Sequence, residues 1–158
     1  MARMRAGGFT LVELLVVVAL LSLVAAIAIP RLGALLHESS LSDEARFAYT
    51  QAQAVRQFAI MRGMDIRIEY INSVPARIRV IDHLSGRPVP EFSERVLPTG
   101  FSLLPTFSVS KSVTYNSQGE ATWLPFIDAP YRIIIRAPTG PERHLLFHRA
   151  GRILFVEP

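Results

Sequence analysis

The chain has 158 residues and no cysteine, with 17 basic and 13 acidic side chains and a formal net charge of +4. This length suits one membrane anchor plus one modest globular domain, and the lack of cysteine excludes disulfide bonds. So small a net charge gives no reason to expect nucleic-acid binding. A folded domain of this chain must be held together by its core alone.

An apolar run covers residues 9–29 and contains one charge, at Glu13. A helix of these 21 residues would be about 31 Å long, the thickness of the hydrocarbon core of a bilayer. The short segment 1–8 is basic through Arg3 and Arg5, so the positive-inside rule keeps it in the cytoplasm. We therefore expect a single span, with the remaining chain on the outer side. A carboxylate inside the bilayer costs about 2.5–3.5 kcal/mol, so Glu13 needs a compensating partner.

The string GFTLVELLVVVALLSLVAAIAIP, at residues 8–30, resembles the N-terminal signature of type IV pilins and type II secretion pseudopilins. This resemblance implies that a prepilin peptidase cleaves after Gly8, removes residues 1–8 as a leader, and methylates Phe9 as the mature N-terminus. Glu13 would then be the acid of the motif that acts in assembly. The free amine of Phe9 in one subunit can pair with Glu13 of a neighbour, which lowers the cost of both buried charges. A simple signal anchor with a stray glutamate is the alternative.

Beyond the span, residues 30–62 are expected to continue the helix in amphipathic form. Pro30 removes one helical hydrogen bond and predicts a kink there. Gly63 is a natural helix end. One stripe of the helix consists of small and aliphatic residues at spacings of three and four, whereas polar residues, Gln51 among them, are expected on the other faces. The stripe comprises Leu41, Ala45, Ala48, Ala52, Val55 and Ala59. It predicts packing against a β-sheet; an independent coiled coil is the alternative.

After Gly63 the apolar residues alternate, which predicts strands. The expected segments are a hairpin of 66–70 and 76–80, short edge strands at 95–97 and 101–104 within a proline-rich stretch, strands at 112–115, 121–123 and 131–137, and a last hairpin of 143–149 and 152–156. The fold class is therefore α+β, pilin-like, with a long N-terminal helix, transmembrane in its first half, packed on an antiparallel β-sheet. The expected divisions are 1–8, 9–29, 30–62 and 63–158, the last forming one globular unit with the helix half before it.

A second resemblance lies in the segment VTYNSQGEATW and the later strand AGRILFV. Both are similar to the C-terminal domain shared by the H-type minor pseudopilin of type II secretion and the FimT/FimU-like minor pilins. This likeness covers most of the outer domain. Many major type IV pilins carry a C-terminal disulfide loop, so a chain without cysteine fits the pseudopilins better.

Signs of enzyme chemistry or of a cofactor are absent from the sequence. It has no cysteine nucleophile, no Gly-x-Ser-x-Gly elbow, no phosphate-binding glycine loop and no metal-ligand cluster. His144 and His148 would chelate a metal on a helix, but we expect a strand, where they would lie about 13 Å apart. We therefore expect no enzyme, no cofactor, no metal and no small-molecule substrate.

DNA binding is an alternative that rests on Arg149 and Arg152. The FimT-like minor pilins use a Gly-Arg-x-Arg pattern near the C-terminus to hold DNA, and the sequence here is Gly151-Arg152-Ile153-Leu154, so the second arginine is missing. Five arginines of the last strands could still form a basic face for phosphates: Arg132, Arg136, Arg143, Arg149 and Arg152. Solvated arginines beside a buried face are the preferred interpretation.

We interpret the chain as an H-type minor pseudopilin, a structural subunit near the tip of the periplasmic pseudopilus in protein export. Its expected partners are the prepilin peptidase, the major pseudopilin, the other minor pseudopilins and the inner membrane. The resemblance implies one span, with a cytoplasmic N-terminus and a periplasmic C-terminal domain. The alternative is a FimT/FimU-like minor pilin of a type IV pilus, acting in pilus assembly or DNA uptake.

Overall fold

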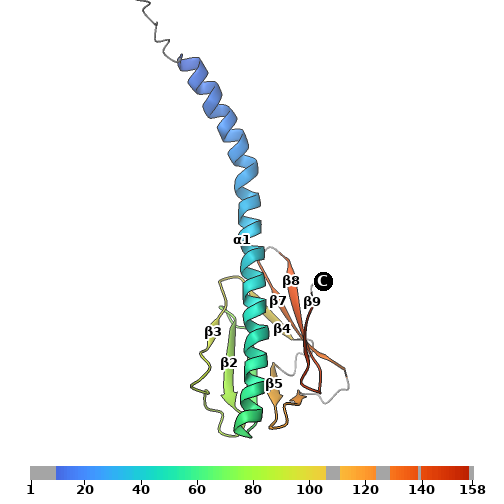
Figure 1. The fold of residues 1–158 in the computed structure, drawn as a ribbon. Coiled ribbons are helices and arrows are strands. Elements are labelled where there is room, and N and C mark those ends of the chain that lie inside the picture. Colours follow the sequence, from blue (N-terminus) through green and yellow to red (C-terminus); the bar gives the residue numbers. More distant parts are fainter. Residues whose placement is uncertain (1–9, 106–110, 124–128, 139, 157–158) are drawn as a thin grey trace, which may run out of the picture. The chain divides into compact units, whose positions relative to one another are not determined.

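The computed structural model describes residues 10–105, 111–123, 129–138 and 140–156. The chain divides into two compact units, residues 1–36 and 37–158. One helix, α1 (Leu11–Arg62), spans 52 residues and belongs to both units (Figure 1). Its segment Leu11–Ile29 is long and apolar enough to cross a membrane, judged by length and composition.

Helix α1 ends where the sequence predicts, at Arg62. Gly63 follows with a φ of 64°, in the left-handed region that glycine adopts without strain. The N–H of Gly63 donates to the carbonyl of Ile60, and the N–H of Met64 donates to the carbonyl of Ala59 at 3.2 Å. These two bonds form a Schellman motif, which satisfies the last carbonyls of the helix.

In the described residues, nine strands form two antiparallel sheets rather than the one sheet expected from the sequence. The strands are β1 (Ile66–Ile71), β2 (Arg77–Asp82), β3 (Arg95–Val96), β4 (Ser102–Pro105), β5 (Ser112–Tyr115), β6 (Ala121–Thr122), β7 (Tyr131–Arg136), β8 (Glu142–Phe147) and β9 (Ile153–Val156). The first sheet has the order β3-β2-β1-β5-β6 and the second has the order β4-β7-β8-β9.

The division into two sheets occurs where strand ladders give way to single hydrogen bonds. Just after β1, the side chain of Asn72 accepts a hydrogen bond from the N–H of Leu103 at 3.2 Å. Similarly, the N–H of Ala121 in β6 donates to the carbonyl of Arg149 at 2.9 Å. Each link satisfies one backbone N–H without extending a ladder, and β4 and β9 are the edges of the second sheet.

Both sheets and the C-terminal part of α1 share one hydrophobic core. The predicted stripe on α1 is fully buried, each of its six residues being no more than 1% exposed. Aromatic rings join the sheets: the ring of Tyr70 on β1 lies 6.1 Å from that of Phe147 on β8, which lies 6.2 Å from Tyr131 on β7. The prediction of core packing for this stripe is therefore confirmed.

One polar residue of α1 departs from the sequence-based assignment of faces, and a second is buried on the same side. Gln51, expected on a polar face, is only 8% exposed, and Glu44 is 4% exposed. The two are seven residues apart and therefore lie on one side of the helix, beside the alanine stripe. The buried face is wider than that stripe and includes both polar side chains.

Candidate assembly and binding sites

The predicted processing site, Gly8 and Phe9, lies outside the described residues. Glu13 stands in the first turn of α1, where its backbone N–H donates to Oγ1 of Thr10 at 3.2 Å. Thr10 is therefore the N-cap, and the spacing Thr-x-x-Glu is that of a capping box. Sequence reasoning missed this cap, although the pattern is readable from the residues. A carboxylate in the first turn also faces the positive end of the helix dipole.

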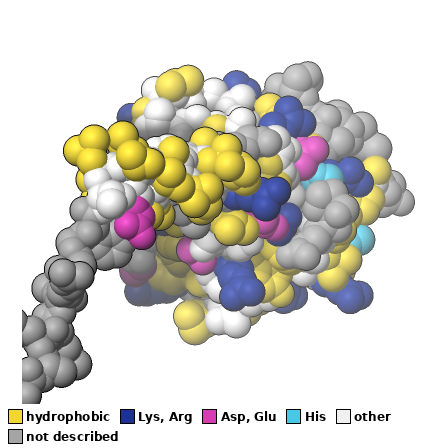
Figure 2. Space-filling view, turned by 90° about the horizontal axis from the view of Figure 1, so that it is seen from above, with side chains coloured by type: hydrophobic (Ala, Val, Ile, Leu, Met, Phe, Trp, Pro, Cys, Tyr) yellow, Lys and Arg dark blue, Asp and Glu magenta, His cyan; other side chains and the backbone are white. Residues whose placement is uncertain are grey.

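The predicted anchor consists of exposed apolar side chains. Large hydrophobic residues from Leu11 to Ile29 are about half or more exposed, and Figure 2 shows apolar side chains gathered along this part of α1. Within the anchor, the hydroxyl of Ser22 donates a hydrogen bond to the carbonyl of Val18 at 2.8 Å. The helix therefore satisfies this polar group internally, as a bilayer requires.

Helix α1 continues through Pro30. A proline at this position has no N–H to donate to the carbonyl of Ala26, so one helical hydrogen bond is missing. The kink predicted at Pro30 stays a prediction.

The five C-terminal arginines do not form one uniform cationic face. Arg136 pairs with Glu142 at 3.1 Å, and Arg143 lies 3.8 Å from Glu38 and is mostly buried. Arg149 and Arg152 are exposed in the β8–β9 turn, separated by Ala150 and Gly151. The possible DNA contact through Arg149 and Arg152 remains a prediction, but neutralisation of Arg136 and Arg143 weakens the electrostatic case for it.

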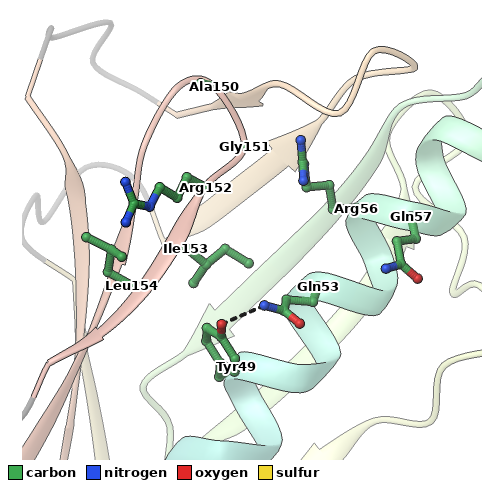
Figure 3. A pocket seen from close by; sticks show the side chains of 9 residues that line it. All are labelled: Tyr49, Gln53, Arg56, Gln57, Ala150, Gly151, Arg152, Ile153 and Leu154. Carbon is green, nitrogen blue, oxygen red and sulfur yellow. Dashed lines mark hydrogen bonds between the residues drawn. The ribbon is translucent and has the colours of Figure 1, made fainter.

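A polar cleft of about 490 Å³ lies between α1 and the β8–β9 turn (Figure 3). Its helix side presents Tyr49, Gln53, Arg56 and Gln57, and its strand side consists of residues 150–154. The amide of Gln53 donates to the hydroxyl of Tyr49 at 2.6 Å. Among the described residues, two arginines and no carboxylate line this cleft, so it favours an anionic group. Sequence periodicity could place the helix residues on one flank, but not opposite residues a hundred positions away.

Arg56, which lines the cleft, also forms a hydrogen bond with the β5–β6 turn. Its Nε donates to the carbonyl of Gly119 in the β5–β6 turn at 2.9 Å. A Cβ added at Gly151, whose φ is 77°, would lie 1.9 Å from that carbonyl oxygen and 2.4 Å from the Arg56 Nε. Glycine is therefore required at position 151 by both space and conformation. Because Gly151 has no side chain, α1, the β5–β6 turn and the β8–β9 turn can approach one another this closely.

A second polar contact ties α1 to the edge strand β3. Arg95 donates two hydrogen bonds to the carboxylate of Glu44, at 2.6 and 3.0 Å, and its guanidinium lies 4.9 Å from the ring centroid of Phe47. These hydrogen bonds with Glu44 raise the pKa of Arg95. The pair joins residues 51 positions apart, so no local pattern in the sequence predicts it.

The two histidines considered as a metal pair do not share a strand. His144 lies in β8, whereas β8 ends at Phe147 and His148 belongs to the following turn. The assigned strand therefore ends one residue before His148, although the N–H of His148 still donates to the carbonyl of Arg152 at 2.9 Å. Within the described residues, no three His, Asp or Glu side chains gather closely enough to hold a metal ion.

The family model described as "Prokaryotic N-terminal methylation motif" matches residues 3–29. No curated protein matches the chain. Among solved structures, the type IV minor pilin FimU of Pseudomonas aeruginosa is similar, with a TM-score of 0.60 and 19% identity over 77% of this chain and 90% of that one. The minor pseudopilin EpsH from the Type 2 Secretion System of Vibrio cholerae has a TM-score of 0.58 and 14% identity over 75% of this chain and 98% of that one.

The two likenesses differ in kind, one being a short sequence motif and the other a fold. The methylation motif ends at residue 29, whereas the folds of FimU and EpsH match three quarters of the chain. The chain therefore combines the prokaryotic N-terminal methylation motif with a pilin-like fold, and its predicted resemblance to the type IV pilin and pseudopilin superfamily is confirmed.

Proposed function

We propose that the chain is an H-type minor pseudopilin, a structural subunit of the periplasmic pseudopilus of a type II secretion system. The observation that carries the proposal is the union of a methylation motif at residues 3–29 with a domain whose fold matches 98% of the EpsH chain. Exposed apolar side chains along the anchor would serve no purpose in a monomer outside the membrane. In a helical filament, they supply the surface on which neighbouring helices pack.

Assembly follows from the N-terminal chemistry. Prepilin peptidase cleaves after Gly8 and methylates Phe9, and the apolar helix holds the mature subunit in the inner membrane. When the subunit joins the filament, Glu13 pairs with the terminal amine of a neighbour, which removes the cost of leaving either charge unpaired in an apolar environment. The partners are then the major pseudopilin and the other minor pseudopilins, which the periplasmic domain contacts near the tip.

A minor pilin of a type IV pilus is the second candidate, because FimU matches with a TM-score of 0.60 over 90% of its own chain. The two functions are separated by complementation. The full-length chain is expressed in one strain that lacks its H-type minor pseudopilin and in another that lacks a FimU-like minor pilin. Restored secretion in the first strain alone supports the proposal, and restored pili in the second strain alone refutes it.

The role of Glu13 is tested with Glu13→Gln, which removes the charge and keeps the shape of the side chain. Mass spectrometry is expected to show normal cleavage after Gly8, whereas recovery of the variant with sheared filaments falls at least tenfold. Glu91→Gln, an exposed carboxylate of the outer domain, is the matched control and should assemble normally. Normal recovery of Glu13→Gln in filaments would contradict the pairing role.

A further inference from the structure

Among the edge strands that the structure describes, β9 has the least protection against an added strand. Strands β3 and β6, at the edges of the first sheet, are two residues long, and β4 ends in Pro105. Short edges and proline are the usual means of preventing an added strand. In contrast, β9 has four residues, Ile153-Leu154-Phe155-Val156, all of them apolar. It forms the end of the sheet order β4-β7-β8-β9.

The hydrogen-bond pattern shows which backbone groups of β9 are open. The N–H of His148 donates to the carbonyl of Arg152 at 2.9 Å, which closes the β8–β9 hairpin. Bonded and non-bonded pairs alternate along an antiparallel ladder, so Leu146 opposite Leu154 is the next bonded pair. The N–H and C=O groups of Ile153 and Phe155 therefore point away from β8. Among the described residues, no other strand pairs with them.

The space beside this open edge is the polar cleft. Ile153 and Leu154 line the cleft together with Gln53 and Arg56 of α1. Figure 3 shows Ile153 directed to the side of α1, whereas Arg152 and Leu154 project to the other face of the strand. A strand added next to β9 would place alternate side chains on these two faces. One set would lie near Ile153 and the other near Arg152.

Charge indicates what kind of strand fits. Arg152 is exposed and Arg56 lies within the cleft, and in the part of the chain that the structure describes no carboxylate lines it. Opposite charges on directly facing strand positions stabilise pairing, whereas like charges destabilise it. A second copy of this chain would bring another Arg152 to the same edge. An acidic strand is therefore the better match.

We propose that the open edge of β9 binds an extended acidic segment of another subunit of the same filament, which pairs with Ile153 and Phe155 and directs a carboxylate to Arg152. This is β-augmentation, in which main-chain hydrogen bonds supply affinity and alternate side chains supply specificity. The assignment of the segment to another filament subunit rests on the proposed function. The preference of the β9 edge for an acidic strand does not.

The chemistry is tested with the full chain in detergent micelles and a fluorescent peptide, acetyl-Thr-Val-Glu-Val-Glu-Val-Thr-amide. A peptide with both glutamates replaced by lysine should bind at least tenfold more weakly. Arg152→Glu should weaken binding of the acidic peptide about five- to tenfold, because an exposed ion pair becomes a repulsive one. Arg87→Glu is the matched control, since Arg87 is an exposed arginine away from the cleft, and should leave binding unchanged.

Amide hydrogen exchange supplies the decisive readout. Bound peptide should slow exchange at Ile153 and Phe155 at least tenfold and leave Leu154 and Val156, which already bond to β8, unchanged. Absence of binding, equal binding of the lysine peptide, or binding without this alternating protection would each overturn the proposal. Failure of the peptide together with normal co-assembly would overturn the inference and leave the proposed function standing.

The source is tested by crosslinking in cells. The chain has no cysteine, so Val156→Cys, at a position 38% exposed, introduces a unique thiol beside the edge. A disulfide to a cysteine placed in another filament subunit supports the assignment. A disulfide-linked dimer of this chain, or no crosslink although the variant assembles, would overturn it.

Discussion

The contact between Glu44 and Arg95 predicts an asymmetric response to mutation. Glu44 has a side chain 5% exposed, whereas that of Arg95 is 43% exposed. Glu44→Ala frees an arginine that can turn into water, so the cost is the loss of charged hydrogen bonds, about 1.5 kcal/mol. Arg95→Ala leaves a buried carboxylate without a partner, and removing one partner of a buried pair costs about 3 kcal/mol or more.

The double variant Glu44→Ala/Arg95→Ala should be more stable than Arg95→Ala alone, because it removes the stranded charge. Unfolding in urea can be followed by the fluorescence of Trp123, the single tryptophan, which is buried against Tyr131.

The matched control is Arg77→Ala, since Arg77 forms an ion pair with Glu94 in which both side chains are well exposed, at 47% and 39%. Its expected cost is below about 0.5 kcal/mol. If Arg95→Ala costs no more than Glu44→Ala, or if the double variant costs the sum of the two, the burial argument is refuted.

Two further predictions concern the core and the turns. Both Gly151 and Gly140 have a positive φ, so alanine is strained at either position, but only at Gly151 does the added Cβ also meet the carbonyl of Gly119. Gly151→Ala should therefore cost about 3 kcal/mol, and Gly140→Ala, whose Cβ would enter open space, should cost clearly less in the same urea assay. Burial raises the pKa of the Tyr70 and Tyr115 phenols above the value of about 10 that they have in the unfolded chain. Their contribution to the free energy of unfolding is therefore complete below that unfolded pKa and is lost as pH rises through the folded pKa values. Tyrosinate absorbance of these two should therefore appear only together with unfolding, and Tyr115→Phe should flatten the alkaline loss of stability; their ionisation in the folded protein near pH 10 would contradict this.

Local chemistry made much of the fold predictable. The alanine stripe, the helix end at Gly63 and the hairpin of β1 and β2 each depend on residues close in sequence, whose period or turn preference is set by the backbone. The N-cap at Thr10, with its Thr-x-x-Glu spacing, is another such local pattern and was equally readable. The full width of the buried face of α1 was harder to predict, because Glu44 and Gln51 are polar and their burial depends on what packs against them.

Long-range geometry accounts for what sequence reasoning did not supply. The division into two sheets depends on where ladders stop, and a ladder stops when a side chain such as Asn72 takes the next N–H. The cleft needs α1 and the β8–β9 turn to meet, and this meeting depends on Arg56, Gly119 and Gly151. Sequence reasoning identified Gly151 and Arg152 as half of a nucleic-acid motif, whereas the contacts show that the glycine is required for packing.

The residues that hold the domain together overlap little with those that are available to a partner, and this decides which variants are informative. Arg152 is exposed and lines the cleft, so its substitution changes charge without removing core contacts. Arg56 lines the same cleft but its Nε supports the carbonyl of Gly119, so Arg56→Ala would leave that carbonyl unpaired and loosen the turn. A loss of binding in an Arg56 variant would therefore confuse stability with recognition, whereas a loss in an Arg152 variant reports on recognition alone.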